Sequence, residues 1–302
     1  MACTTCPKQK KLLAYLIAFG AAFVGFSMLL APAKKTSMAK PMISLSTFPL
    51  YESARIVAGD TLNIKTIIPL GSDAHAYSPS PADVAEISKS SLFIYSGGGF
   101  EAWAQPLKSS LPKSLKIIDM SRHVELLKND PHYWLNIDNM ITMTNVMEAE
   151  FSTLSPQHKD LYHKNATAYI AELKKLKSEY TVGLKECKNR TLITNHNAFG
   201  YLAHVNNLKN ISIIGLSSDE QPSAKTMATI ITLVKKEKIK TLFFEELIDD
   251  NVAQTIARES GAKAQSLQPL ENISEDELKS HQTYLTIMGD NLKKMREAME
   301  CR

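Results

Sequence analysis

Residues 63–77 read NIKTIIPLGSDAHAY, an apolar segment that stops at Pro69 and passes into a polar loop carrying His75. Pro81 follows, in a position that suits the first turn of a helix running to about Ser88. A short apolar strand, a loop and a helix in this order form one unit of an alternating α/β fold.

The same order recurs on both sides of this unit. Further strands are expected at Ile43–Ser46, Ser91–Ser96, Leu115–Met120, Thr191–Thr194, Ile211–Leu216, Thr241–Phe244 and Ala264–Leu267. Further helices are expected at Phe48–Ala58, Phe100–Lys108, Ser223–Lys236, Asn251–Ser260 and Glu275–Met299. This alternation predicts right-handed βαβ units and mostly parallel sheets.

The alternation breaks in the middle of the chain. Asn136–Leu154 has a helical pattern, and Pro156 opens a second one that reaches about Lys188. About 30 helical residues span roughly 45 Å, the width of a lobe. We therefore predict an α/β protein of two (β/α)4 lobes with separate cores, joined by one long rigid helix. The expected parts are an N-terminal lobe at 42–155, the linking helix at 156–188 and a C-terminal lobe at 189–302.

Residues 1–33 have the layout of a secretory signal. The first 11 are polar and basic, Leu12–Ala31 carries no charge, and Ala31-Pro32-Ala33 resembles an A-x-A cleavage site. The apolar run has 20 residues, enough to span a bilayer, so an uncleaved anchor is the alternative to a cleaved signal. In both cases we expect an exported protein, in the periplasm or elsewhere outside the cytoplasm.

The net charge of +4 comes largely from this extension. Residues 1–33 hold three of the 35 basic residues and no acidic one, which leaves 32 basic against 31 acidic residues and a net charge of +1. This balance gives no indication of a nucleic-acid surface.

Four cysteines have to be placed. Cys3 and Cys6 lie ahead of the apolar run, where no redox or zinc role is expected. Cys187 and Cys301 belong to the exported part, and an oxidising compartment would allow them to pair. Because a sequence does not give the distance between two thiols, a Cys187–Cys301 disulfide is a hypothesis.

Four side chains with metal-binding chemistry lie just past expected strands: His75, His132, His196 and Glu271. The carboxyl ends of parallel strands open into the ligand crevice, so these residues can converge in a cleft between the lobes. Three imidazoles and one carboxylate suit a tetrahedral zinc ion, whereas a manganese site would be expected to have more oxygen donors.

The segment Asp130-Pro131-His132-Tyr133-Trp134 gives His132 a stiff, partly apolar setting, because proline fixes its own φ and restricts the residue before it. The remaining histidines lack such a setting and are expected to be structural or solvated: His123, His158, His163, His204 and His281.

Four motifs resemble those of a known family. Residues 75–83 (HAYSPSPAD), 130–134 (DPHYW), 196–201 (HNAFGY) and 221–224 (QPSA) are similar, in the same order, to motifs of the ZnuA/TroA family. The members are metal-binding solute receptors of ABC importers, and the resemblance covers about Met42–Met299. It implies two lobes, a long backbone helix, one metal in the interlobe cleft, and release through local movement of ligand loops.

The resemblance also implies the ligands. It carries His75, His132 and His196 over as metal ligands, and the zinc-type branch with a Pro-Leu-Glu segment implies Glu271 as the fourth. Manganese members have an aspartate where this chain has Glu271, which favours zinc.

The chain departs from the family pattern in three places. Asn197 replaces the usual aspartate after the third histidine, and Ala74 replaces a proline before the first, which concerns the orientation of the ligands. The His/Asp/Glu-rich loop of many zinc members, expected between Trp103 and His132, is absent from the sequence.

We therefore predict a monomeric solute-binding protein that captures Zn²⁺ outside the cytoplasm and delivers it to an inner-membrane ABC permease. No catalytic residue and no nucleic-acid partner are expected, and the protein is not expected to be an enzyme. A Mn²⁺ or Fe²⁺ receptor of the same family is one alternative. A zinc hydrolase is another, and it would need an open coordination position with Glu245 or Glu246 as general base. A third is an adhesin or surface-interaction protein that uses the metal only for folding.

Overall fold

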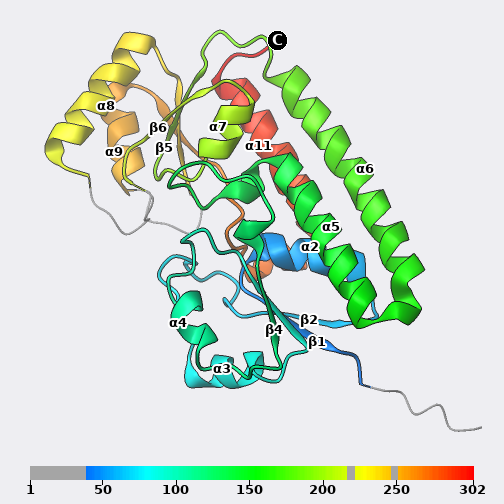
Figure 1. Cartoon of the computed structure of the whole chain (residues 1–302). Coiled ribbons are helices and arrows are strands. Elements are labelled where there is room, and N and C mark those ends of the chain that lie inside the picture. Colours follow the sequence, from blue (N-terminus) through cyan, green and yellow to red (C-terminus); the bar gives the residue numbers. More distant parts are fainter. Residues whose placement is uncertain (1–38, 216–221, 246–250) are drawn as a thin grey trace, which may run out of the picture. The chain divides into compact units, whose positions relative to one another are not determined.

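Two four-stranded parallel sheets form the framework of the chain in a computed structural model, which describes residues 39–215, 222–245 and 251–302 (Figure 1). The first sheet has the order β2-β1-β3-β4 and the second the order β6-β5-β7-β8. The strands are β1 (Met42–Leu45), β2 (Asn63–Thr66), β3 (Leu92–Tyr95), β4 (Lys116–Asp119), β5 (Thr191–Thr194), β6 (Lys209–Ser212), β7 (Thr241–Phe244) and β8 (Lys263–Ser266). The predicted α/β class with two parallel sheets is confirmed.

The sequence of each strand explains its place in the sheet. β3 is LFIY and buried at every residue, as expected for a central parallel strand covered on both faces. β2 is NIKT, and its residues alternate between exposed and half-buried at the sheet edge. In both sheets the strand order reverses between the two central strands, where parallel sheets commonly bind ligands.

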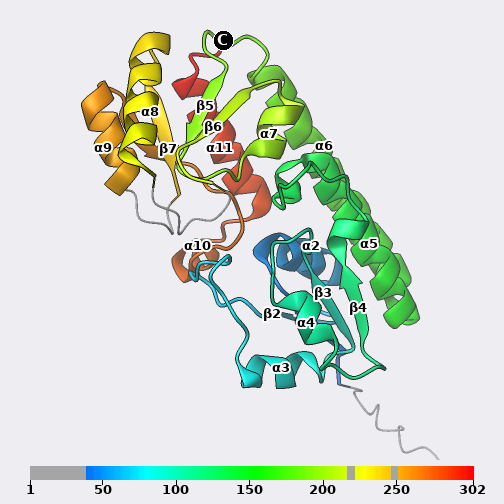
Figure 2. The same cartoon turned by 60° about the vertical axis from the view of Figure 1, so that its left-hand side comes forward.

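Helices cover the faces of both sheets, and Figure 2 shows α8 and α9 side by side on one face of the second sheet. The helices are α2 (Phe48–Ala58), α3 (Pro81–Ile87), α4 (Ala104–Lys108), α5 (Ile137–Leu154), α6 (Lys159–Gly183), α7 (Gly200–Val205), α8 (Ala224–Glu237), α9 (Asn251–Ser260), α10 (Glu275–Lys279) and α11 (Tyr284–Ala298). Three 3₁₀ turns complete the set: η1 (Met120–Arg122), η2 (Tyr133–Leu135) and η3 (Pro156–His158). None of the helices in the described part of the chain is long and apolar enough to cross a membrane; Leu12–Ala31 lies outside it.

Several predicted boundaries are wrong. The helix expected over Glu275–Met299 is two helices, because His281 has a φ of 60° and Thr283 caps α11 through a capping box. The helix expected from Phe100 begins only at Ala104, since the preceding residues form turns closed by main-chain hydrogen bonds. The strand expected at Ile211–Leu216 is β6, which lies earlier and ends at Ser212.

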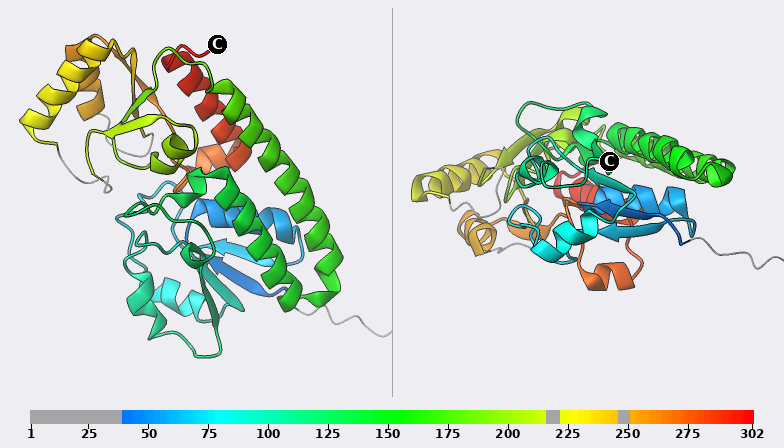
Figure 3. Two further views of the ribbon diagram at one scale, coloured as in Figure 1. Left: turned by 45° about the horizontal axis from the view of Figure 1, so that its top comes forward. Right: turned by 60° about the horizontal axis from the view of Figure 1, so that its bottom comes forward.

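The long helix α6 connects the two lobes. It has 25 residues, about 37 Å, and it starts after a 3₁₀ turn instead of at Pro156. Near its start the Tyr162 hydroxyl lies 2.8 Å from Thr61 Oγ1, and near its end the Tyr180 hydroxyl donates to the Met288 carbonyl at 2.7 Å. Figure 3 shows α6 running alongside α5 and α11. The helix is therefore fixed to both lobes at its two ends.

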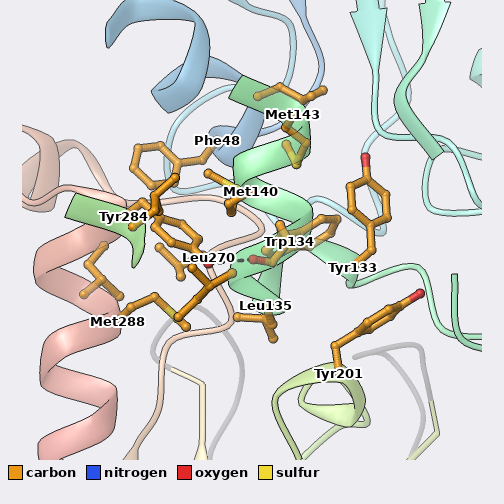
Figure 4. Close-up of a cluster of buried hydrophobic side chains, with 14 of the residues drawn as sticks. Phe48, Tyr133, Trp134, Leu135, Met140, Met143, Tyr201, Leu270, Tyr284 and Met288 are labelled. Carbon is orange, nitrogen blue, oxygen red and sulfur yellow. Dashed lines mark hydrogen bonds between the residues drawn. The ribbon is translucent and has the colours of Figure 1, made fainter. Parts of the chain in front are cut away.

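The largest hydrophobic cluster is shared by the lobes, contrary to the expectation of separate cores. Figure 4 shows Phe48 and Trp134 from the first half of the chain packed with Leu270, Tyr284 and Met288 from the second. The Tyr284 hydroxyl donates to the Trp134 carbonyl at 2.7 Å, and the Trp134 indole N–H donates to the Pro269 carbonyl at 2.8 Å. Each lobe also has a smaller cluster of its own.

Cys187 and Cys301 form a disulfide, so the hypothesis raised by the sequence is confirmed. The bond joins two residues 114 positions apart, one just before β5 and the other next to the C-terminus. The Arg302 N–H donates to the Glu186 carbonyl beside it at 2.9 Å. The disulfide thereby ties the segment that leads into β5 to the residues that follow α11.

Removing this disulfide should lower the free energy of unfolding. It should not disturb the residues that follow β5 at its carboxyl end, away from the disulfide. A disulfide that closes a long loop contributes about 2–4 kcal/mol, and the double variant Cys187→Ser/Cys301→Ser should lose about that much free energy of unfolding in urea. Non-reducing peptide mapping should recover residues 186–188 linked to residues 297–302. Recovery of these two peptides unlinked, or equal urea midpoints, would contradict the assignment.

Candidate metal centre

The four predicted metal-binding side chains lie together. One ligand atom from each of His75, His132, His196 and Glu271 lies within 4.8 Å of the others. The Nε2 atom of His132 is 3.4 Å from that of His75 and 3.5 Å from that of His196. Glu271 Oε1 is 3.1, 2.9 and 3.3 Å from the Nε2 atoms of His75, His132 and His196.

These distances fit a tetrahedral ion. A regular tetrahedron with metal–ligand distances of about 2.0–2.1 Å has edges of about 3.3–3.4 Å. Five of the six separations between the ligand atoms run from 2.9 to 3.5 Å, and all six are within 4.8 Å. Three imidazole nitrogens and one carboxylate oxygen form a donor set that suits zinc. The residues present therefore fit a bound zinc ion.

His132 is held by the residue two positions before it. One oxygen of Asp130, Oδ1, lies 2.8 Å from His132 Nδ1 and also accepts the His132 backbone N–H at 2.9 Å. The imidazole is fully buried and packs edge-on against Trp134 and Phe100. Because Nδ1 faces a carboxylate, Nε2 is directed to the shared centre.

His196 has an equivalent carboxylate partner. It follows β5, is fully buried, and its Nδ1 contacts the Glu245 carboxylate, which follows β7. The sequence identified Glu245 only as a candidate general base, so its contact with His196 was missed. Asn197 is the position that departs from the family pattern. Its side-chain oxygen accepts a hydrogen bond from the Asn210 side-chain amide.

His75 and Glu271 are held together across the lobes by Asn272. Its side-chain amide donates to the Pro69 carbonyl at 2.6 Å and to the Ser72 carbonyl at 2.9 Å. The Gly71 N–H in turn donates to the Ile273 carbonyl at 2.9 Å. The loop that carries His75 is therefore tied to the segment that carries Glu271, a connection no sequence pattern indicated.

The site is nearly closed to solvent. The side chains of His132 and His196 are 0% exposed and that of Glu271 is 8% exposed, while that of His75 is 12% exposed. A cavity of about 20 Å³ borders Glu271 and Glu245, which leaves room for roughly one water molecule. His75 is thus the most accessible of the four.

Charge is concentrated in this buried site. Burial lowers the pKa of His196, but the Glu245 and Glu271 carboxylates outweigh it and raise that pKa to about 10. Burial also acts to lower the pKa of His132, and its hydrogen bonds to Asp130 and Glu271 raise it above the usual value. Burial acts to raise the pKa of Glu271, yet the three imidazoles hold it well below the normal range. Without a metal, these pKa shifts favour the ionised form of the Glu271 carboxylate and the protonated forms of His132 and His196.

The other histidines lie elsewhere. His204 is exposed on α7, His163 pairs with Glu148 on α5, and His281 occupies the break between α10 and α11. The metal-binding cluster found among the described residues contains none of them. Glu246 and Gln221 lie outside the described ranges.

Replacing Glu245 should weaken metal binding at a distance. Glu245→Gln keeps the volume but removes the anionic acceptor of His196 Nδ1, and zinc affinity should fall about 10–100-fold, as for other partners of ligating imidazoles. Competition with a zinc-binding dye measures the change. Glu259→Gln, at a carboxylate 59% exposed on α9, is the matched control. Equal affinity of both variants would contradict the orienting role.

Together the fold and site define a class, the two-lobed α/β protein with a candidate metal-ligand cluster where the lobes meet. The family model ZnuA, described as "Zinc-uptake complex component A periplasmic", matches residues 43–298. The chain belongs to this family, which confirms the resemblance seen in the motifs. The family consists of extracytoplasmic substrate-binding receptors.

Known relatives cover most of the chain. The zinc-binding lipoprotein AdcA of Streptococcus pneumoniae is 33% identical over 287 residues, which is 88% of this chain and 57% of AdcA, so the chain spans little more than half of that relative. The high-affinity zinc uptake system protein ZnuA of Bacillus subtilis is 30% identical over 272 residues, 83% of this chain and 85% of that protein. The crystal structure of the Zn(II)-bound ZnuA-like domain of S. pneumoniae AdcA matches with a TM-score of 0.78 and 35% identity, over 87% of this chain and all of that domain.

Proposed function

We propose that this protein captures Zn²⁺ outside the cytoplasm through His75, His132, His196 and Glu271 and delivers it to an ABC permease for zinc uptake. The observation that carries the proposal is the cluster of four ligand atoms with separations close to the edges of a zinc tetrahedron. Family membership and the zinc-binding names of the relatives support it.

Zinc is favoured over manganese by the ligands. Three neutral nitrogens and one carboxylate form a complete tetrahedral sphere, whereas Mn²⁺ prefers oxygen donors and more of them. Asp130 and Glu245, two further buried carboxylates, are engaged with the Nδ1 atoms of His132 and His196.

A zinc hydrolase is disfavoured by the same contacts. Such an enzyme keeps one coordination position open for water and needs a general base beside it. Glu271 would close the sphere, and Glu245 contacts the far side of the His196 ring. The neighbouring cavity of about 20 Å³ is also too small for an organic substrate.

We further propose that residues 42–155 and 189–302 act as the two lobes of a monomer, with residues 156–188 as the link. Residues 1–33 would direct export, as a cleaved signal or as an anchor. The membership of a periplasmic receptor family supports an extracytoplasmic location.

Growth under zinc limitation tests delivery. Cells that have the cognate permease but lack this gene should grow poorly in a zinc chelator, and the full chain should restore growth and ⁶⁵Zn uptake. The variant Glu271→Gln should not restore them. Full uptake with that variant, or manganese rescue in place of zinc rescue, would contradict the proposal.

A further inference from the structure

The Asp130 carboxylate faces two ways. Its Oδ1 atom binds the ring and backbone of His132, and its Oδ2 atom points to Gly200, the first residue of α7. Asp130 is 9% exposed. A carboxylate from the first lobe is thus placed between a ligand of its own lobe and a helix of the other lobe.

Gly200 makes room for this carboxylate. A Cβ atom on Gly200 would overlap Asp130 Oδ2 and lie 3.4 Å from its carboxyl carbon. Gly200 is not among the residues with positive φ, so its backbone does not require glycine. Glycine is a poor helix residue compared with alanine, and the space taken by Asp130 is what excludes a side chain here.

The next residue, Tyr201, adds a second contact between α7 and the loop that carries Asp130. Its hydroxyl donates to the Asp130 carbonyl at 3.1 Å and accepts the Leu127 N–H at 2.6 Å. Tyr201 is 2% exposed, so these bonds are sheltered from water. Two successive residues of α7 therefore hold the loop that carries His132.

We propose that Gly200 is a positioning residue for metal binding, which admits the Asp130 carboxylate that orients His132 and, with Tyr201, ties the His132 loop to α7. Because α7 starts four residues after His196, this contact also fixes the position of His132 in the first lobe relative to His196 in the second. The inference rests on the proposed function, since it concerns the same zinc site.

A double-variant cycle on the full, metal-stripped chain tests it. Zinc affinity is measured by competition for the wild type, Gly200→Ala, Asp130→Ala and the double variant, and Co²⁺ loading reports ligand geometry through its visible absorption. Gly200→Ala should weaken zinc binding about 10–100-fold and shift the Co²⁺ bands. Asp130→Ala removes the group that Cβ would overlap, so adding Gly200→Ala to it should change affinity little. Gly289→Ala, at a position on α11 with open space, should behave as the wild type.

The outcomes separate the two proposals. Gly200→Ala with wild-type affinity and an unshifted Co²⁺ spectrum would overturn the positioning role. A Gly200→Ala penalty that is equally large with and without the Asp130 carboxylate would overturn it too, because it would reflect a general defect in α7. A wild-type chain that does not bind zinc would overturn the proposed function itself.

Discussion

Glu271→Gln should lose more than about 100-fold in zinc affinity, beyond the range typical of residues that only orient a ligand. The substitution keeps the volume and the backbone contacts but replaces an anionic oxygen donor with a neutral amide. Three buried imidazoles would remain, without the negative charge that now lies within 3.3 Å of each Nε2 atom. Competitive titration with Zn²⁺ and Mn²⁺ measures the loss and shows which ion the intact site prefers.

The matched control is Glu275→Gln, four residues further on and 70% exposed on α10. It should bind zinc as tightly as the wild type. His204→Ala, at an exposed imidazole on α7, provides the same comparison for His132→Ala. If Glu271→Gln kept full affinity, Glu271 would not be a ligand; if His132→Ala kept it, the proposed site would be wrong.

Zinc affinity should fall steeply as the pH is lowered. In the metal-free site the pKa of His196 is raised to about 10, so at neutral pH its imidazole carries a proton that zinc must displace. The pKa of His132 is also raised, which shifts its deprotonation to higher pH. Below these raised pKa values each displaced proton costs about tenfold in apparent affinity per pH unit, so affinity rises with pH and falls with acidification.

Two measurements check this sign and size. Competitive titrations between about pH 6 and 8 give the slope, and calorimetry in buffers of different ionisation enthalpy gives the number of protons released. Glu245→Gln removes a main cause of the raised His196 pKa and should make the slope shallower. A pH-independent affinity, or proton uptake on binding, would contradict the charge distribution of the site.

Most of the framework could be predicted from the sequence because the apolar strands are short and clearly bounded. β5 and β7 have the predicted limits, as do α2 and α9. The errors lie where a side chain or one backbone angle decides the outcome. His281 at φ 60° divides the last helix, and a pattern of helical spacing carries no sign of that angle.

The four residues of the site could be predicted as a set because each follows a strand, and the structure brings them together. Their role as ligands stays a prediction. Asn272 and Gly200 could not be predicted, since each depends on which loops of the two lobes meet. The Glu245–His196 contact was equally hidden, because two adjacent glutamates follow β7 and the sequence does not tell them apart.

The hydrophobic cluster that joins Trp134 to Tyr284 has a consequence for how a permease would distinguish a loaded receptor from an empty one. A hinge between the lobes would have to separate these buried rings and break the hydrogen bond between them. The cost of exposing that surface favours an outline that is nearly the same with and without cargo. Under the proposed function, a permease would then recognise the loaded state by a local change near the metal. The His75 loop bears the most accessible of the four side chains and is the part of the site best placed to present that change.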